Sequence, residues 1–172
     1  METIDAIKTR RSVREFTDRG VDDIVIEEII DAGRWAPSGL NNQAWRFIVV
    51  RNNDIRNELS KHTHYGAILK NAPSLIVVFL DSEQMYDHTK DVQSIGACIQ
   101  NMLLALHSLG LGGVWLGEIL KKKEKVNELL GAPESYELMA VVALGYPANK
   151  KRTSERKGIS ELTFRERFGK SW

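Results

Sequence analysis

One long apolar segment, at about residues 89–109, most constrains what this chain can fold into. Apolar residues recur in it at three- and four-residue spacing, which is the pattern of one helical face. Further small and apolar residues, Cys98 among them, widen that face nearly all round, so we predict a central, buried helix. Gly110 stands where a left-handed residue commonly ends a helix. The rest of the chain must pack around this helix.

Segments with strand composition alternate with helical patterns along the chain. Residues 74–80 form a continuous apolar run, typical of a strand covered on both faces. Residues 45–50, 114–116 and 136–144 are further strands by their β-branched and aromatic content. Two helices are expected before the first strand, beginning near Thr3 and near Asp22 or Asp23. Two more are expected between strands, beginning near Asn53 and at the lysine run 121–125. This order predicts a small central sheet flanked by helices.

Bulk composition limits the classes of function. The 172 residues are long enough for one domain with a real core, and we expect a single domain over 1–172. The net charge of +1 gives no whole-molecule attraction for nucleic acid or membranes. The apolar stretch 95–116 is interrupted by polar residues and glycines, so it is not a membrane span. Cys98 is the only cysteine and the N-terminus lacks an apolar secretory core, which together favour a cytoplasmic protein.

A basic stretch, Arg10-Arg11-Ser12-Val13-Arg14, follows the first helix. In an extended backbone, alternate side chains share a face, so Arg10, Ser12 and Arg14 would project together. Two guanidinium groups and a hydroxyl suit a phosphate, because guanidinium matches phosphate geometry in two-pronged fashion. The alternative is a solvated basic turn between two helices, which this segment alone would favour.

Two other segments invite a functional interpretation. The polar loop 37–43 leads directly into a strand, where ligands often bind, although its amides could equally satisfy only their own backbone. Gly112, Gly113 and Gly117 suggest backbone lying close to something flat or bulky, or else a strand bounded by ordinary turns. The helix–glycine–strand order excludes a dinucleotide fingerprint. His62 and His64 lack a third ligand at suitable spacing, so we expect no metal site.

Four motifs in collinear order resemble the FMN-dependent nitroreductase family over nearly the whole chain. They are residues 10–14 (RRSVR), residues 36–47 (APSGLNNQAWRF), residues 101–105 (NMLLA) leading to 110–117 (GLGGVWLG), and residues 145–147 (GYP) followed by Arg156-Lys157. The sequence departs from the family at Ala44, where many members have proline, and it is shorter than many members.

The resemblance implies an α+β fold: a three-layer α/β/α arrangement with a central, mostly antiparallel or mixed sheet. It implies a homodimer with FMN at the interface, in which a tail at about residues 148–172 wraps the partner subunit. Arg10, Ser12 and Arg156 would hold the FMN phosphate, and Arg14 would face the pyrimidine end of the flavin. We include Arg11 in the cofactor-binding segment, although its side chain projects to the other face and suits a structural or solvated role.

The remaining cofactor-binding positions also come from the resemblance. Pro37, Ser38, Asn41 and Gln43 would reach the flavin from the second subunit. Trp115, Leu116 and Gly117 would lie beside the isoalloxazine, with a backbone N–H bonding to flavin N5. The flavin carries the chemistry, so no side chain is expected to be catalytic, which agrees with the lack of a nucleophile triad or carboxylate pair.

The implied function is an FMN oxidoreductase that takes hydride from NAD(P)H and reduces nitroaromatics, quinones or similar small acceptors in a two-step exchange. One alternative is a flavin enzyme of the same fold with another reaction, such as dehalogenation, dehydrogenation or flavin fragmentation. A second is a flavin sensor without catalysis. A third is nucleic-acid binding by the basic stretch 150–157, against which the near-neutral net charge argues.

Overall fold

The structure is a computed structural model that describes residues 1–149 and 153–172. Its α-helices are α1 (Thr3–Thr9), α2 (Asp23–Arg34), α3 (Asn53–Ser60), α4 (Gly66–Asn71), α5 (His88–Ser108), α6 (Lys123–Leu130) and α7 (Ile159–Leu162). Its strands are β1 (Trp45–Val50), β2 (Ser74–Asp81), β3 (Gly112–Leu116) and β4 (Tyr136–Gly145). Two short 3-10 helices, η1 (Gly39–Asn41) and η2 (Glu118–Lys122), complete the described elements.

The strands form one sheet in the order β1-β2-β4-β3, and every neighbouring pair is antiparallel. β2 lies inside the sheet and all of its residues are buried, as the continuous apolar run predicts. At the free edge of β3, Ser12 adds a single parallel bridge to Gly113. The predicted mostly antiparallel sheet is therefore confirmed.

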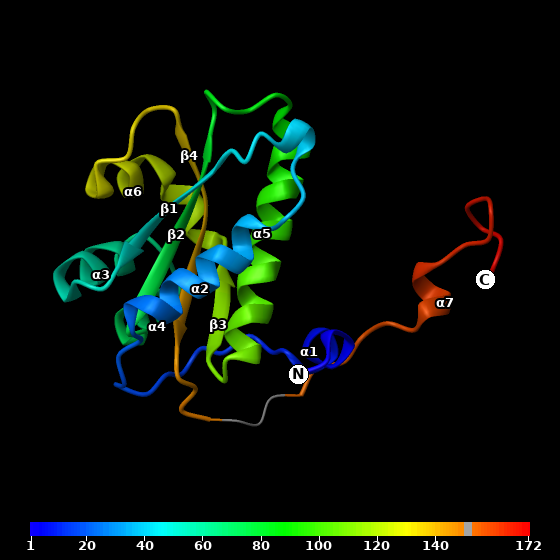
Figure 1. Ribbon diagram of the computed structural model, residues 1–172, viewed down its shortest axis with the longest axis horizontal. Helices are drawn as coiled ribbons and strands as arrows, with labels where there is room; N and C mark the ends of the chain where they lie inside the picture. Colours follow the sequence, from blue (N-terminus) through cyan, green and yellow to red (C-terminus); the bar gives the residue numbers. More distant parts are fainter. Residues whose placement is uncertain (150–152) are drawn as a thin grey trace.

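Helices cover both faces of this sheet (Figure 1). Ile76 and Val78 of β2 point into a core built with α2 and α5. Leu75 and Val77 point the other way, into a second core built with α3, α4 and α6. Side chains of alternate residues in β2 thus pack into two cores on opposite faces of the sheet. This gives the predicted three-layer α/β/α arrangement.

The predicted central helix is α5, and its ends follow local signals. The side chain of Asp87 accepts a hydrogen bond from the Lys90 backbone N–H at 3.0 Å. Gly110 has φ +78°, and the Leu111 N–H returns to the Leu106 carbonyl at 2.8 Å. Cys98 is fully buried in the core that α5 shares with the sheet. The helix is thereby fixed at both ends and along its length.

The helices α1, α2 and α3 begin at the predicted residues Thr3, Asp23 and Asn53, and the cap position of each lies one residue earlier. Asn52, not Asn53, caps α3, because its side-chain oxygen accepts two backbone N–H groups at 2.8 and 3.1 Å. Thr3 does not cap α1, whose N-terminal cap position is Glu2 without a side-chain bond. The lysine run begins in η2, and α6 starts only at Lys123. The six-residue helix α4 was not predicted, since it offers too few periodic positions to be seen.

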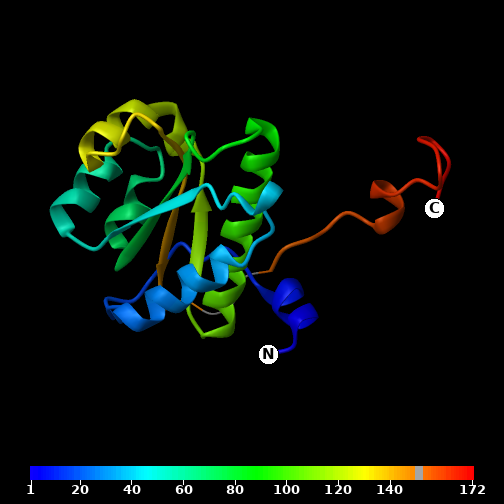
Figure 2. The ribbon, with the colours of Figure 1, turned by 45° about the horizontal axis from the view of Figure 1, so that its top comes forward.

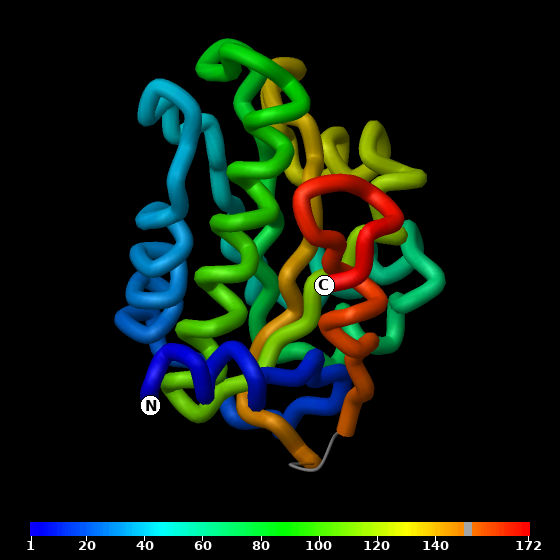
Figure 3. The backbone as a smooth tube through the Cα atoms, turned by 90° about the vertical axis from the view of Figure 1, so that its right-hand side faces the viewer, coloured from blue at the N-terminus to red at the C-terminus, as the bar shows by residue number. Residues whose placement is uncertain are grey.

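The C-terminal arm, residues 153–172, extends away from the three-layer body in both Figure 1 and Figure 2, and Figure 3 views it from its own side. Its large apolar side chains are exposed: Ile159, Leu162, Phe164, Phe168 and Trp172. The Phe164 and Phe168 rings contact each other within the arm, at 4.4 Å between centroids. Residues 150–152 of the predicted tail lie outside the described residues.

Candidate functional site

The basic stretch is extended, which is the condition under which its alternate side chains share a face, and it lies along the free edge of β3. The Val13 N–H donates to the Gly113 carbonyl at 3.0 Å, beside the Ser12–Gly113 bridge. A hollow of about 320 Å³ opens over this segment, with the arm forming its far wall. Its lining residues are Arg10, Arg11, Ser12, Arg14, Thr153, Ser154 and Arg156. The structure therefore brings together the residues predicted to hold a phosphate, including Arg156 from far along the chain.

Four arginines line this hollow, and its described lining contains no acidic side chain to balance their charge. Arg10 is half-buried, and burial lowers the pKa of its guanidinium, which the nearby charges of Arg11 and Arg156 lower further. The Arg10 Nε is buried and has no hydrogen-bond partner among the described residues. None of Arg10, Arg14 and Arg156 forms a salt bridge in the described part of the chain. A dianionic phosphate would supply both the missing acceptor and the missing countercharge.

Arg11 has a different role from its two neighbours. Its Nη1 donates to the carbonyls of Lys8 at 2.7 Å and Arg10 at 2.9 Å, which lie at the end of α1. These bonds satisfy carbonyls that a helix end leaves unpaired. The Nε of Arg11 is buried without a partner among the described residues. Arg11 thus supports the segment structurally while one of its donors remains available.

Arg14 also lines a second hollow, of about 630 Å³, which it shares with the residues that follow it in the chain. Arg56 and Lys70 line the same hollow, together with Asn71 at the end of α4. Sequence analysis did not connect these residues with Arg14, because α4 reaches this place only through the packing of the sheet. Glu15 and Asp18 line this second hollow as well, so it presents charges of both signs next to the first.

The loop before β1 has an unusual backbone. Leu40, Asn41 and Gln43 all adopt left-handed conformations, with φ of +53°, +55° and +49°. Such angles are uncommon outside glycine and indicate that the surrounding structure fixes the loop. The Gln43 N–H donates to the Ser38 hydroxyl at 3.2 Å, which closes the loop on itself. Pro37, Asn41 and Gln43 remain exposed, so their side chains face outward.

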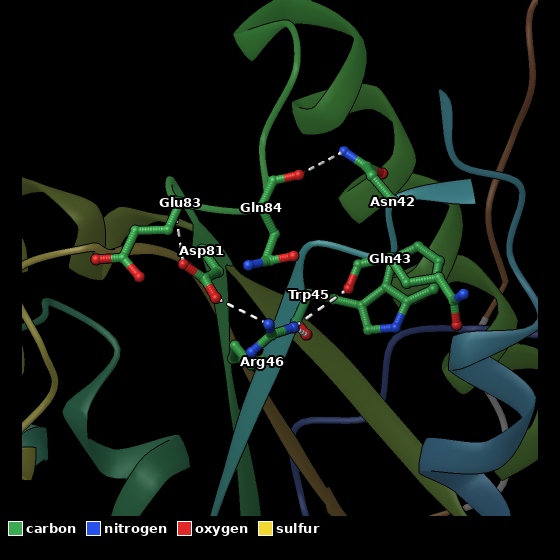
Figure 4. Close-up of polar contacts among 7 residues, drawn as sticks. All are labelled: Asn42, Gln43, Trp45, Arg46, Asp81, Glu83 and Gln84. Atoms are coloured by element: carbon green, nitrogen blue, oxygen red, sulfur yellow. Dashed lines mark hydrogen bonds and ion pairs between the residues drawn. The ribbon is translucent and has the colours of Figure 1, made fainter. Parts of the chain in front are cut away.

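Asn42, which sequence analysis did not single out, ties this loop to the body. Its Nδ2 donates to the Gln84 carbonyl at 3.1 Å and to Asp91 Oδ1 at 2.7 Å (Figure 4 shows the Gln84 contact). Asp91 is buried in the first turn of α5, and its other oxygen accepts the Tyr86 and Asp87 N–H groups. Burial raises the pKa of Asp91, but the bonds from Asn42, Asp87 and Tyr86 outweigh it and leave the pKa lowered.

The end of β3 carries the third group of predicted residues. Trp115 is partly exposed, Leu116 is buried, and Gly117 is exposed with open space where a Cβ would stand. A Cβ at Gly112 would meet Val13 at 2.4 Å, and one at Gly113 would meet Leu106 at 2.7 Å, so the protein's own side chains leave no room for one. Both glycines also line a hollow of about 340 Å³ together with Arg10 and Arg11, so their closeness to a ligand stays a prediction.

The His62–His64 segment holds the turn after β3 in place. The carboxylate of Glu118 accepts the His64 backbone N–H at 2.9 Å and the Thr63 hydroxyl at 2.8 Å. These bonds lower the pKa of Glu118 to about 2, the His64 bond being the largest cause. Within the described residues no cluster of potential ligands could hold a metal, and no helix is long and apolar enough to cross a membrane.

Two of the three groups of predicted residues, the basic stretch and the polar loop, lie at opposite ends of α5. Thr9, next to the basic stretch, contacts His107 near the end of the helix at 2.8 Å. Asn42 contacts Asp91 near its start. Sixteen positions separate Asp91 from His107, which amounts to about 24 Å along a helix. One chain therefore does not bring the loop 37–43 to the basic hollow, and Figure 1 shows the two segments beside opposite ends of α5.

Comparison with known proteins gives these segments a family. The model of the nitroreductase family matches residues 7–67 and 60–146. A Methanothermobacter thermautotrophicus protein with the provisional name NADH dehydrogenase/NAD(P)H nitroreductase is 40% identical over 157 residues, which are 90% of this chain and 82% of that protein. A Vibrio harveyi NADPH-flavin oxidoreductase is 34% identical over 84% of this chain and 65% of its own length.

Solved structures agree with the sequence relatives. The crystal structure of a Desulfovibrio desulfuricans protein, provisionally described as a nitroreductase and complexed with FMN, has a TM-score of 0.91 at 44% identity. The alignment covers 98% of this chain and 99% of that one. The Vibrio harveyi NADPH:FMN oxidoreductase, complexed with NAD+, has a TM-score of 0.89 at 27% identity over 98% of this chain and 78% of its own. The chain described here belongs to the nitroreductase family.

Proposed function

We propose that this protein is an FMN-dependent oxidoreductase that uses NAD(P)H. The observation that carries the proposal is the basic hollow, in which Arg10, Ser12 and Arg156 converge around a buried, unpaired Nε. A phosphate dianion is proportionate to these donors, since charged hydrogen bonds to it are among the strong ones. Relatives of this chain are named NAD(P)H nitroreductase and NADPH-flavin oxidoreductase, and one similar structure holds FMN.

The residues of this chain would divide the work of binding. Arg10, Ser12 and Arg156 would hold the phosphate, with Arg11 supporting the segment from the end of α1. Arg14, which lines both hollows, would stand at the pyrimidine end, where Lys70 adds a second cation. Cations there favour negative charge on a ligand's ring. Trp115, Leu116 and Gly117 would lie beside the ring, where the open surface at Gly117 admits a flat group.

We further propose a homodimer in which Pro37, Ser38, Asn41 and Gln43 complete the site of the partner subunit. The separation of about 24 Å along α5 supports this, because the loop and the basic hollow of one chain are far apart. Leu40 supports it too: its side chain is 86% exposed in a left-handed backbone, an arrangement that suits contact with another molecule. The apolar C-terminal arm would wrap the same partner.

Bound FMN would supply the hydride-transfer chemistry, so no side chain is required to act as acid, base or nucleophile. Reduced nicotinamide and a small acceptor, such as a nitroaromatic or a quinone, would use the same place in turn, which gives a two-step exchange. A cytoplasmic location fits the one cysteine, Cys98, which is buried and unpaired.

An anaerobic visible spectrum of the purified protein tests the proposal. We expect a yellow protein, or uptake of added FMN by a colourless one, followed by bleaching with NADH or NADPH and recovery on adding a quinone. A protein that takes up no FMN would contradict the proposal at its base. Bound FMN that neither nicotinamide reduces would favour a different flavin reaction or a flavin sensor.

A further inference from the structure

The side chain of Arg46, in β1, joins the polar loop to the end of β2 (Figure 4). Its Nη2 lies 2.8 Å from Asp81 Oδ2. Its Nη1 donates to two carbonyls, that of Trp45 at 2.9 Å and that of Gln43 at 3.2 Å. The second oxygen of Asp81 accepts the Glu83 N–H at 3.1 Å. One guanidinium therefore connects a well-fixed carboxylate with the backbone of the loop.

Sheet pairing does not require this contact. β1 and β2 are already held by their ladder, and the Asp81 N–H donates to the Ala44 carbonyl at 2.8 Å. The Asp81 side chain is only 7% exposed, so its charge needs a close partner, and Arg46 is that partner. The bond to the Gln43 carbonyl reaches beyond the strand, to a residue held at φ +49°. The extra contact acts on the loop rather than on the sheet.

Gln43 is thus fixed from two sides. Asn42, its neighbour, is tied to Gln84 and Asp91, and Arg46 holds the Gln43 carbonyl itself. A left-handed residue persists only where surrounding contacts determine it. A side chain that is already aimed at its ligand loses less freedom on binding, which raises affinity. The Gln43 Nε2 donates to the Asn41 carbonyl at 3.3 Å, and the amide remains exposed. Fixing the Gln43 backbone therefore fixes the place at which this amide would meet a ligand.

We propose that Arg46, braced by Asp81, is a positioning residue that aims the Gln43 amide at the FMN of the partner subunit. The inference rests on the proposed function, because it takes Gln43 as an FMN ligand. Arg46 itself touches no ligand in this scheme; it acts through the backbone of Gln43. Its contribution should therefore vanish when the Gln43 amide is removed.

A double-mutant cycle on FMN affinity tests this dependence. We expect Gln43→Ala and Arg46→Met each to raise the FMN Kd by roughly 2- to 10-fold, the scale of ordering one side chain. The double variant should bind FMN no more weakly than Gln43→Ala alone. Losses that multiply would show that Arg46 acts independently of Gln43 and would overturn the inference, as would an unchanged Kd for Arg46→Met.

Two further variants make the result decisive. Arg51→Met is the matched control, because Arg51 follows the other end of β1 and pairs with Asp23 at 2.5 Å, away from the loop; its FMN Kd should equal that of the wild type. Asp81→Asn keeps the shape of the side chain and replaces Arg46→Met in the cycle if that variant fails to fold. The loss of FMN affinity caused by Asp81→Asn should also disappear in the Gln43→Ala background. Wild-type protein that takes up no FMN contradicts the proposed function, whereas multiplying losses contradict only this inference.

Discussion

Replacing Arg10 by alanine should weaken FMN binding without lowering the stability of the FMN-free protein. With FMN, the variant loses a donor that is half-buried and has no other partner in the described structure. A charged hydrogen bond of this kind contributes about 1.5–3 kcal/mol. At 1.4 kcal/mol for each factor of ten, the FMN Kd should rise roughly 10- to 150-fold. Without FMN, the variant loses only a charge that Arg11 and Arg156 oppose, so the apoprotein should be no less stable.

Two measurements on the same samples check this pair of effects. Quenching of flavin fluorescence gives the Kd, and thermal unfolding of the apoprotein gives its Tm. Arg34→Ala is the control, since Arg34 is an exposed arginine that pairs with Asp31 outside the site. An unchanged Kd would refute the phosphate role of Arg10. A clear drop in the Tm of the apoprotein would refute the view that the arginine cluster lacks a countercharge.

Three shorter predictions address the surroundings of the site. Glu118→Gln should have a lower Tm than the wild type at neutral pH, because the bonds from His64 and Thr63 hold the folded-state pKa of Glu118 near 2. The difference in Tm should shrink as the pH falls from 4.5 towards 2, and a difference independent of pH would contradict this. Gly112→Ala should cost about 1–3 kcal/mol of unfolding free energy in urea titrations and also weaken FMN binding, since the new Cβ would overlap Val13 in the basic stretch; a variant as stable as the wild type would oppose it. Burial raises the pKa of the Cys98 thiol to about 12, so the native protein should not react with a thiol reagent at pH 8, and reaction before unfolding would count against that burial.

Local pattern was enough to predict most of the fold. The apolar run of β2 indicated a strand covered on both sides, and the all-round apolar helix indicated the central α5, because both signals lie within a single segment. Gly110 ended its helix because its left-handed backbone, with φ of +78°, depends only on the nearest residues. The shared face of Arg10, Ser12 and Arg14 followed from an assumed extended backbone, and both the phosphate role and the place of Arg156 needed the family resemblance.

The parts that sequence could not supply depend on distant partners. Asn42 and Asp91 lie 49 positions apart, and only the antiparallel pairing of β1 with β2 places Asp81 beside Arg46. Sequence analysis did not show that Val13, about a hundred residues earlier in the chain, packs where a Cβ of Gly112 would stand. Such contacts are consequences of tertiary packing, so a residue type at a given spacing does not reveal them.

The length of α5 has a genetic consequence. If the basic hollow and the loop 37–43 that bind one flavin belong to different subunits, then two defective alleles can complement each other. A subunit that lacks the Arg10 side chain, paired with one that lacks the Gln43 amide, would assemble one site with both groups and one site with neither. Coexpression of two weakly active variants would then restore part of the activity that neither has alone, up to one working site in each mixed dimer.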